Sequence, residues 1–456
     1  MRTFTPLWLL VALGTVSSLG AGRAAWAAPP AEWKCESCPF EKGSTGTVDL
    51  GVGHVTDSSP KHGDYTGLDE EGAFAIAGAT FRYRGDGGYF TDFAATDLGL
   101  DTRSLYANGG REGSWAYRLG YGEIPRHLSE GAASPFFGIG GGLLTLPPGY
   151  PAASTAGMPL AATLQPVDIE YKRSRIDIGG TLLGPVGWQF RVDARRDVRD
   201  GTQRSAGSFF SSTTQLVAPL DQTTDQVEAV AEYADRRWQA SFGYRGSVFS
   251  NGNDSLTWQN PFTPVVAGAT TGQLALAPDN EFHEVFGTVG YQFSPGLRAS
   301  GELSIGRMTQ NQAFLSPTLN PTLTTLPLPA ASLDGEVETL DATLRLTASP
   351  MDQLRLAASL IRNERDNKTS SQQYQQVSTD MFLGATQANL PYSFTRDRAK
   401  LEADYRGSSW KMAGGIDYDA LKRTLQETDK TEETTIWARG SVQPVENLGL
   451  ALKLLH

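Results

Sequence analysis

The chain has 456 residues, of which 20% are charged, and its formal net charge is −11 at pH 7. This acidic balance argues against a nucleic-acid partner, because phosphate binding needs clustered Lys and Arg in excess. The mean hydropathy of −0.30 excludes a helical membrane protein, since each transmembrane helix needs about 20 consecutive apolar residues. With 2 cysteines in the whole sequence, disulfides do not hold the fold together.

Residues 1–27 have the composition of a secretory signal peptide. Arg2 gives a charged start, residues 7–16 form an apolar centre, and Ala25-Trp26-Ala27 is a small-x-small cleavage site. No Arg pair precedes the apolar centre, which favours the general secretory route over the twin-arginine route. We therefore predict an exported protein.

Residues 28–45 are predicted to form a periplasmic segment with one compact motif, Cys35-Glu36-Ser37-Cys38-Pro39. Attachment of a c-type haem needs a His directly after the second Cys, and Pro39 stands there instead. A zinc site would need two further ligands, and only His54 and His62 follow, at a distance. We interpret Cys35 and Cys38 as a candidate disulfide or redox pair, because thiols in Cys-x-x-Cys motifs exchange readily with envelope oxidants.

From Gly46 onward, apolar and polar residues alternate with a period of two, which gives each strand one apolar and one polar face. We count roughly sixteen or seventeen strands, each near the 9–11 residues expected of a membrane strand. The polar positions are rich in Arg, Asp, Gln and Gly, whereas the apolar positions often carry Trp, Tyr or Phe at strand ends. The clearest segments are 115–122, 188–195, 227–233, 238–245, 297–307, 340–346, 354–360 and 401–405.

The connections alternate in length, which distinguishes a membrane barrel from a soluble sandwich. Loops longer than about 15 residues rarely follow one another in a sandwich, whereas outer-membrane barrels join short turns on one side to long loops on the other. Tight turns are predicted at 184–187, 235–237, 294–296, 350–353, 406–409 and 444–447. Long loops are predicted near 124–165, 198–224, 250–280, 310–335 and 367–390.

The predicted fold is all-β: a large transmembrane antiparallel up-and-down β-barrel over residues 46–456, with short periplasmic turns and long extracellular loops. A spanning sheet must close on itself, because hydrocarbon offers no partner to a free backbone N–H or C=O. A barrel of this size encloses an open or plugged lumen rather than a packed core. The predicted location is the outer membrane of a Gram-negative bacterium, with the lipid bilayer against the apolar side.

No residue pattern indicates catalysis or a metal site. The five histidines form no H-x-x-x-H pair and are predicted to be solvated at strand ends or in loops: His54, His62, His127, His283 and His456. Two acidic clusters could gather around calcium but are interpreted as solvated loop charge: Asp64, Asp69, Glu70 and Glu71, and Asp193, Asp197 and Asp200. No serine has the setting of a nucleophile with a base and an orienting carboxylate. We expect a protein that is not an enzyme and binds no cofactor itself.

A series of short segments, in order along the mature chain, resembles the MtrB/PioB family of decahaem-associated outer-membrane proteins. These segments are residues 33–38 (WKCESC), 48–53 (VDLGVG), 63–68 (GDYTGL), 122–125 (GEIP), 171–173 (YKR), 255–262 (SLTWQNPF) and 274–280 (LALAPDN), followed by Phe282-His283. Cys35 and Cys38 correspond to a Cys pair that one branch of the family carries. The resemblance covers nearly all of the mature chain.

The resemblance implies a function that composition does not indicate. Family members are wide barrels that sheathe a periplasmic decahaem c-type cytochrome in the lumen, often with a second multihaem cytochrome docked outside, so that electrons cross the outer membrane. The haem is carried by the partner cytochrome. The alternative is a diffusion porin or solute-uptake barrel with an aqueous lumen. Family members are typically longer than this chain, and the last strand stops at Leu454-Leu455-His456, so we expect a barrel that is incomplete at its C-terminal end.

Overall fold

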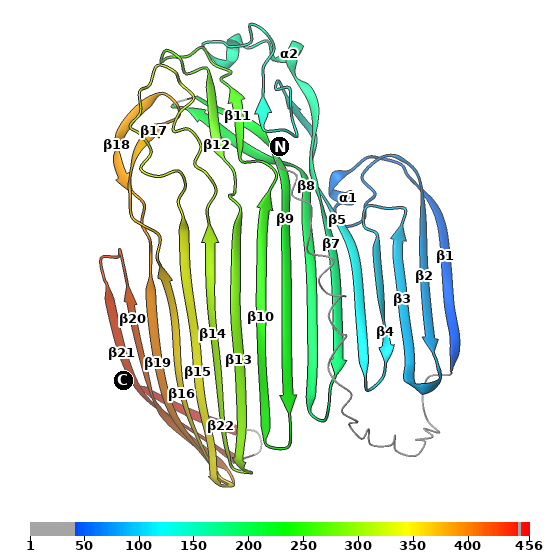
Figure 1. Ribbon diagram of the computed structural model, residues 1–456, viewed down its shortest axis with the longest axis vertical. Coiled ribbons are helices and arrows are strands. Elements are labelled where there is room, and N and C mark those ends of the chain that lie inside the picture. The colour runs from blue at the N-terminus through cyan, green and yellow to red at the C-terminus, as the bar shows by residue number, and fades with distance from the viewer. Residues whose placement is uncertain (1–41, 211, 446–447) are drawn as a thin grey trace, which may run out of the picture. The chain divides into compact units, whose positions relative to one another are not determined.

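The computed structural model describes residues 42–456 apart from residues 211, 446 and 447 (Figure 1). Within these residues, no helix is both long enough and apolar enough to cross a membrane. The main element is a 17-stranded sheet. Its strands are β1 (Gly43–Val55), β2 (Gly72–Arg84), β3 (Tyr89–Leu98), β4 (Ser104–Arg111), β5 (Trp115–Ser134), β7 (Gln165–Leu183), β8 (Trp188–Phe209), β9 (Ser212–Ala234), β10 (Trp238–Asn251), β13 (Asn280–Ser294), β14 (Leu297–Gln310), β15 (Gly335–Met351), β16 (Leu354–Asn367), β19 (Phe394–Arg406), β20 (Trp410–Arg423), β21 (Lys430–Val445) and β22 (Leu448–Leu455).

Each strand of this sheet pairs antiparallel with the next one along the chain, from β1 with β2 to β21 with β22 (Figure 1). The pairings of the described residues leave β1 and β22 at the two edges. The up-and-down antiparallel topology and the strand number agree with the sequence-based prediction.

Short turns join the strands at one end of the sheet, and most of the longer connections lie at the other end (Figure 1). The predicted turns between β7 and β8, β9 and β10, β13 and β14, β15 and β16, and β19 and β20 are confirmed. Further short turns join β2 to β3, through the 3-10 helix η1 (Asp86–Gly88), and β4 to β5. We call the two ends the turn end and the loop end.

Of the predicted long loops, one is wrong and another is shorter than predicted. Residues 198–209 continue β8 and residues 212–224 begin β9, and these two strands pair as far as Phe209 and Ser212. Residues 124–134 likewise continue β5, so the loop before β7 covers only 135–164. These strand ends carry no alternating apolar face because they extend past the apolar band, and the period of two is therefore absent from their sequence.

The register places the alternating residues of all strands on two distinct faces. Leu344 on β15 is paired with Gly301 on one side and Leu360 on the other, whereas the adjacent Thr343 is paired with Glu302 and Ile361. Because paired residues of antiparallel strands lie on the same face, the apolar positions form one continuous surface. We call this surface the apolar face and the opposite one the charged face.

Large side chains on the apolar face are widely exposed in the isolated chain. Leu344, Leu401 and Leu452 are 60%, 58% and 64% exposed, and each is on the apolar face of its strand. Exposed apolar surface of this extent marks contact with a membrane or another protein. A period of two over so many strands indicates hydrocarbon along the whole surface.

Aromatic side chains mark both borders of the apolar band. At the turn end, rings of neighbouring strands meet in pairs: Trp188 with Tyr233 at 5.2 Å, Trp238 with Tyr291 at 4.6 Å, and Tyr405 with Trp410 at 5.1 Å. Towards the loop end, the hydroxyls of three tyrosines on this face bond to polar side chains. Tyr121 donates to Glu123, Tyr244 bonds to His283 at 2.7 Å, and Tyr418 donates to Glu432 at 3.1 Å.

The spacing between these borders fits a bilayer. Trp238 and Tyr244 are six residues apart and Trp410 and Tyr418 are eight apart, which is roughly 20–27 Å along a strand at about 3.4 Å per residue. A lipid-facing barrel has an apolar band roughly 25 Å tall between two aromatic girdles, and its strands tilt by about 35–45°, so these lengths cover roughly 14–22 Å of that height. The aromatic residues predicted at strand ends therefore form interfacial rows.

The long connections at the loop end fold together into what we call the loop cap, residues 135–164, 252–279, 311–334 and 368–393. They contain a small sheet of β6 (Leu143–Leu144), β11 (Ser255–Gln259) and β12 (Thr271–Ala275), and a hairpin of β17 (Gln373–Ser378) and β18 (Phe382–Ala388). Short helices η2 (Thr155–Gly157) and α2 (Leu160–Thr163) complete it, while α1 (Pro60–Gly63) lies in the β1–β2 loop.

The loop cap has its own hydrophobic core, to which the extended ends of β8 and β9 contribute. Trp258 packs edge-on against Phe209 at 6.0 Å, and both belong to a buried cluster with Leu256 and Leu144. Buried Asn320 joins three loops, since its amide donates to the carbonyl oxygens of residues 267 and 380, both at 3.0 Å. Burial raises the pKa of Tyr150 in the same cap. The long loops predicted near 124–165, 250–280, 310–335 and 367–390 therefore contribute to one folded unit.

Candidate functional site

Charged side chains of nearby strands meet in a row that crosses the charged face from β5 to β13. Arg118 on β5 contacts Asp193 on β8 at 2.5 Å, and Arg191 joins Asp193 at 2.8 Å to Glu228 on β9 at 2.9 Å. The row continues from Glu228 to Arg245 on β10 at 2.9 Å and from Arg245 to Glu284 on β13 at 3.2 Å. We call these six residues the charge row.

The register explains why the charge row forms. Asp193 is paired with Glu228, Glu228 with Arg245, and Arg245 with Glu284, so that four of its members are direct cross-strand neighbours. Opposite charges directly across a sheet attract, whereas the two adjacent carboxylates would repel. Arg191 removes that repulsion, because its guanidinium contacts both Asp193 and Glu228.

A glycine makes the longest contact of the row possible. Arg118 and Asp193 are on strands that do not touch, and Gly179 of β7 lies between them, paired with both. A Cβ at Gly179 would lie 2.6 Å from the Oδ1 atom of Asp193 and 3.1 Å from the Nη2 atom of Arg118. The absence of a side chain at this position therefore lets the guanidinium reach across β7.

Arg245 is held by an aromatic ring as well as by carboxylates. Its guanidinium lies 5.3 Å from the centre of the Phe286 ring. That ring covers Gly243, its cross-strand partner, where a Cβ would meet the ring at 2.4 Å. Cation–π contact and two carboxylates thus fix this side chain in one orientation.

Further ion pairs extend the pattern over the charged face. Asp197 accepts from Arg173 at 2.5 Å and from Arg175 at 3.0 Å, which joins β7 to β8 near the loop end. On the later strands, Arg396 contacts Asp419 at 2.5 Å. Nearer the turn end, Arg439 of β21 reaches Asp404 of β19 at 3.2 Å across the small Ala413.

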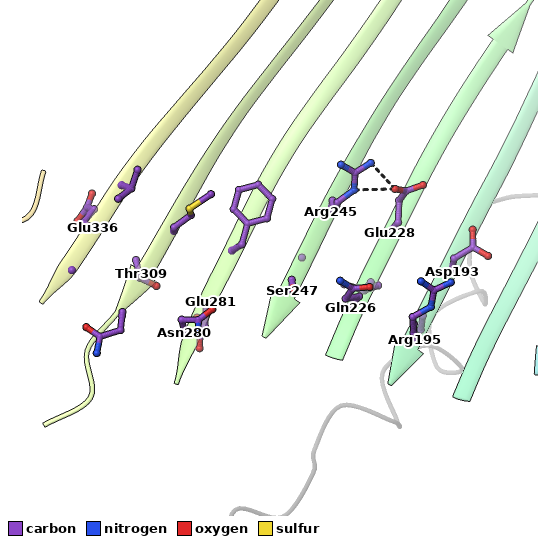
Figure 2. A pocket seen from close by; sticks show the side chains of 18 of the residues that line it. Asp193, Arg195, Gln226, Glu228, Arg245, Ser247, Asn280, Glu281, Thr309 and Glu336 are labelled. Carbon is purple, nitrogen blue, oxygen red and sulfur yellow. Dashed lines mark hydrogen bonds and ion pairs between the residues drawn. The ribbon is translucent and has the colours of Figure 1, made fainter. Parts of the chain in front are cut away.

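A cavity of about 890 Å³ lies along the charge row, and Figure 2 shows Asp193, Glu228 and Arg245 extending from neighbouring strands into it. Two dashed contacts join Arg245 to Glu228 (Figure 2). The side chains of Arg118 and Arg245 remain 54% and 50% exposed despite their ion pairs. The described chain therefore leaves them open to a further occupant.

The geometry of this face fits binding by a wall of fixed charges. The arginines and carboxylates are mutually neutralised, and each is held by the next strand rather than by a loop. Such a wall can orient a large polar guest with its guanidinium and carboxylate groups.

The five histidines predicted to be solvated lie in different elements of the structure. His54 is in β1, His62 in α1 and His283 near the start of β13, while His456 follows β22. For His127 the prediction of a solvated loop or strand-end position is wrong, because β5 continues past it and its side chain is only 11% exposed. No sequence pattern singles it out, since one partner comes from the β1–β2 loop and the other from another strand.

Of the two acidic clusters, one lies in a strand and the other in a loop. Asp193, Asp197 and Asp200, predicted as loop charge, all lie within β8, and the first two bind arginines. Asp64 and the acidic residues 69–71 do lie in the β1–β2 loop. Cys35 and Cys38 are outside the described residues, as are the signal peptide and residues 28–41 of the predicted periplasmic segment, so these remain predictions.

Comparison with known proteins identifies the family to which the chain is similar. The family model described as outer membrane beta-barrel porin, MtrB/PioB, matches residues 54–456. The outer membrane protein MtrB of Shewanella baltica (strain OS185) is 32% identical over 424 residues, which are 92% of this chain and 60% of that protein. The chain thus spans less than two thirds of the length of this relative.

The solved structures similar to the chain include two that are named as transporters. The RagAB peptide transporter has a TM-score of 0.40 and 8% identity, with 88% of this chain and 52% of that chain covered. The copper transporter OprC has a TM-score of 0.38 and 11% identity, with 90% and 69% covered.

The family match agrees with the apolar face, the aromatic rows and the alternation of turns and loops. The sheet is the wall of an outer-membrane β-barrel in a Gram-negative envelope, as the sequence predicted. The chain belongs to the MtrB/PioB family of outer-membrane β-barrel proteins.

Proposed function

We propose that this barrel sheathes a multihaem c-type cytochrome, whose haems carry electrons across the outer membrane through the lumen. The observation that carries the proposal is the charged face: its ion pairs run from strand to strand, and the arginines stay about half exposed beside an open cavity. A hydrocarbon core cannot host a polar multihaem protein unaided. A barrel with hydrocarbon outside and fixed charges inside resolves that mismatch.

The division of labour follows from this arrangement. The barrel supplies insulation and orientation, the partner carries every haem, and the barrel itself carries none and catalyses no reaction. Self-neutralised pairs make the wall polar without strong net charge, so a guest docks without having to supply an equal opposite charge. The loop cap offers a folded surface at the outer end, on which a second, extracellular multihaem cytochrome would dock.

The second candidate is a diffusion porin, which the family description and the cavity of about 890 Å³ both favour. The two functions predict the same strands and differ only in what fills the lumen. A porin would conduct ions by itself, whereas a sheath would need its guest.

Purification from native outer membranes distinguishes the two. We expect the tagged chain to co-purify with a haem-staining protein, and proteoliposomes with both proteins to reduce an enclosed dye when reductant is added outside. Liposomes with the barrel alone should leave the dye oxidised. Stable ion conductance by the barrel alone in planar bilayers, with no haem protein bound in native membranes, would establish the porin instead.

A further inference from the structure

Outside the charged face, three side chains from distant parts of the chain converge at one point near the loop end. They are Asp69 of the β1–β2 loop, His127 of β5 and Glu170 of β7. The Nδ1 atom of His127 lies 2.8 Å from Glu170 Oε2 and 3.5 Å from Asp69 Oδ2. One ligand atom from each residue lies within 4.8 Å of the others.

The cluster is located beyond the apolar band. His127 is on the same face of β5 as Tyr121, six residues further towards the loop end, which is roughly 20 Å at about 3.4 Å per residue. It therefore lies outside the hydrocarbon and within reach of ions from the medium. Glu170 is its direct cross-strand partner.

The β1–β2 loop is built to hold Asp69 in place. The backbone N–H of Ser59 donates to the backbone oxygen of Asp69 at 2.8 Å. Buried Gly63 lies so close that a Cβ there would be 2.3 Å from the Asp69 Cβ. From the same loop, Asp64 accepts the backbone N–H of His127 at 2.8 Å. These contacts orient the carboxylate and the imidazole before any ion binds.

The surroundings favour a cation. A cavity of about 580 Å³ adjoins the cluster, and its lining includes no Lys or Arg among the described residues. Six carboxylates line it: Asp69, Glu70, Glu71, Asp101, Asp168 and Glu170. Asp101 is neutralised by Arg103 at 3.0 Å and Lys172 at 3.6 Å. Among the described residues, neither Asp69 nor Glu170 forms an ion pair with an arginine or a lysine.

The imidazole of His127 alone does not neutralise the two carboxylates of this site. The Nε2 atom of His127 is buried and has no hydrogen-bond partner among the described residues. A protonated imidazolium between the two carboxylates would leave a charged N–H buried and unpaired at Nε2, which costs more than the neutral N–H that a metal-bound imidazole leaves there. A neutral imidazole could satisfy only one carboxylate through Nδ1. A metal ion bound to Nδ1 neutralises both carboxylates at once.

We propose that Asp69, His127 and Glu170 bind one divalent transition-metal ion of the Zn²⁺ or Mn²⁺ class, which clamps the β1–β2 loop onto β5 and β7. Separations of 2.8 and 3.5 Å between ligand atoms suit metal–ligand bonds of about 2.0–2.2 Å. An imidazole nitrogen favours such ions over Ca²⁺, which prefers six to eight oxygen ligands. The clamp crosses β3 and β4, because these two strands separate β2 from β5 in the sheet.

The test uses the full chain without a histidine tag, with Cys35→Ser and Cys38→Ser so that no thiol binds the probe. Zn²⁺ titration by calorimetry should give one site per barrel, and Co²⁺ should give a visible absorption band from a nitrogen ligand. His127→Gln and Glu170→Gln should each weaken Zn²⁺ binding at least about 10-fold. His283→Gln is the matched control, since His283 also lies beside a carboxylate, Glu281, but is 47% exposed.

A melting experiment gives an answer even if a variant is less stable. EDTA should lower the Tm of the parent and of His283→Gln, and leave that of His127→Gln unchanged. The proposal is overturned if no stoichiometric Zn²⁺ or Mn²⁺ binding is found, if His127→Gln binds as the parent does, or if the site takes Ca²⁺ alone. None of these outcomes bears on the cytochrome, so the proposed function stands or falls separately.

Discussion

At the scale of single residues, the ion pairs of the charged face depend on small residues between their partners. Gly179 is the clearest case, because Arg118 reaches Asp193 across the space that a side chain would fill. Ala413 lies in the same way between Asp404 and Arg439. The half-exposed pairs are individually worth about 0–1 kcal/mol. Their role is to fix the geometry of the wall.

Gly179→Ala tests this dependence. The new Cβ would lie 2.6 Å from Asp193 Oδ1, so the Arg118 contact breaks, and we expect the free energy of unfolding to fall by about 1–2 kcal/mol. The neighbouring Gly180→Ala is the matched control, because its Cβ meets nothing within 4 Å. Urea unfolding followed by tryptophan fluorescence measures both. Equal stabilities of the two variants would contradict the account.

At the scale of a strand, adjacent residues face different solvents. Leu344 lies near the middle of the apolar face of β15, and Thr343 lies on the charged face of the same strand. Leu344→Arg should destabilise the barrel by about 2–4 kcal/mol, as expected for an arginine at the bilayer midplane. Thr343→Arg adds the same charge opposite Glu302 and should cost little. If both substitutions cost the same in folding into lipid vesicles, the two faces do not differ as described.

The loop cap is an element with its own stability. Leu256 is fully buried in its core, while its cross-strand partner Leu274 is 40% exposed. Leu256→Ala should cost about 2–5 kcal/mol locally, and so speed proteinase K cleavage within 252–279 without lowering the Tm of the barrel. Leu274→Ala should leave cleavage near the parent rate. A parallel loss of barrel Tm would mean that cap and sheet unfold together.

The sequence predicted the elements that the membrane constrains. Within the bilayer, one face must be apolar at every second residue, so segments such as 340–346 and 354–360 were readily recognised, as were the tight turns between them. Beyond the bilayer that constraint ends. The sequence of residues 198–224 predicts a loop, because the ends of β8 and β9 pack against the cap rather than lipid and so lack the period of two.

For the charge row, the sequence predicts only the types of residue and the face of the sheet on which they lie. Alternation places Arg191, Asp193 and Glu228 on the polar side, but their contacts depend on register, which no local pattern specifies. The same holds for His127, whose partners Asp69 and Glu170 lie far away in sequence. Long-range pairing brings these groups together, and a single sequence carries little signal of it.

At the scale of the whole molecule, the central claim is that hydrocarbon lies against the apolar face and a polar interior against the charged face. Spin labels at each position from 340 to 348 on β15, in the Cys35→Ser, Cys38→Ser background, measure this directly in native-lipid vesicles. We predict that oxygen reaches the even-numbered positions, such as 344, and that a water-soluble nickel reagent reaches the odd-numbered ones, such as 343. Accessibility without a period of two, or with the two phases reversed, would contradict the account.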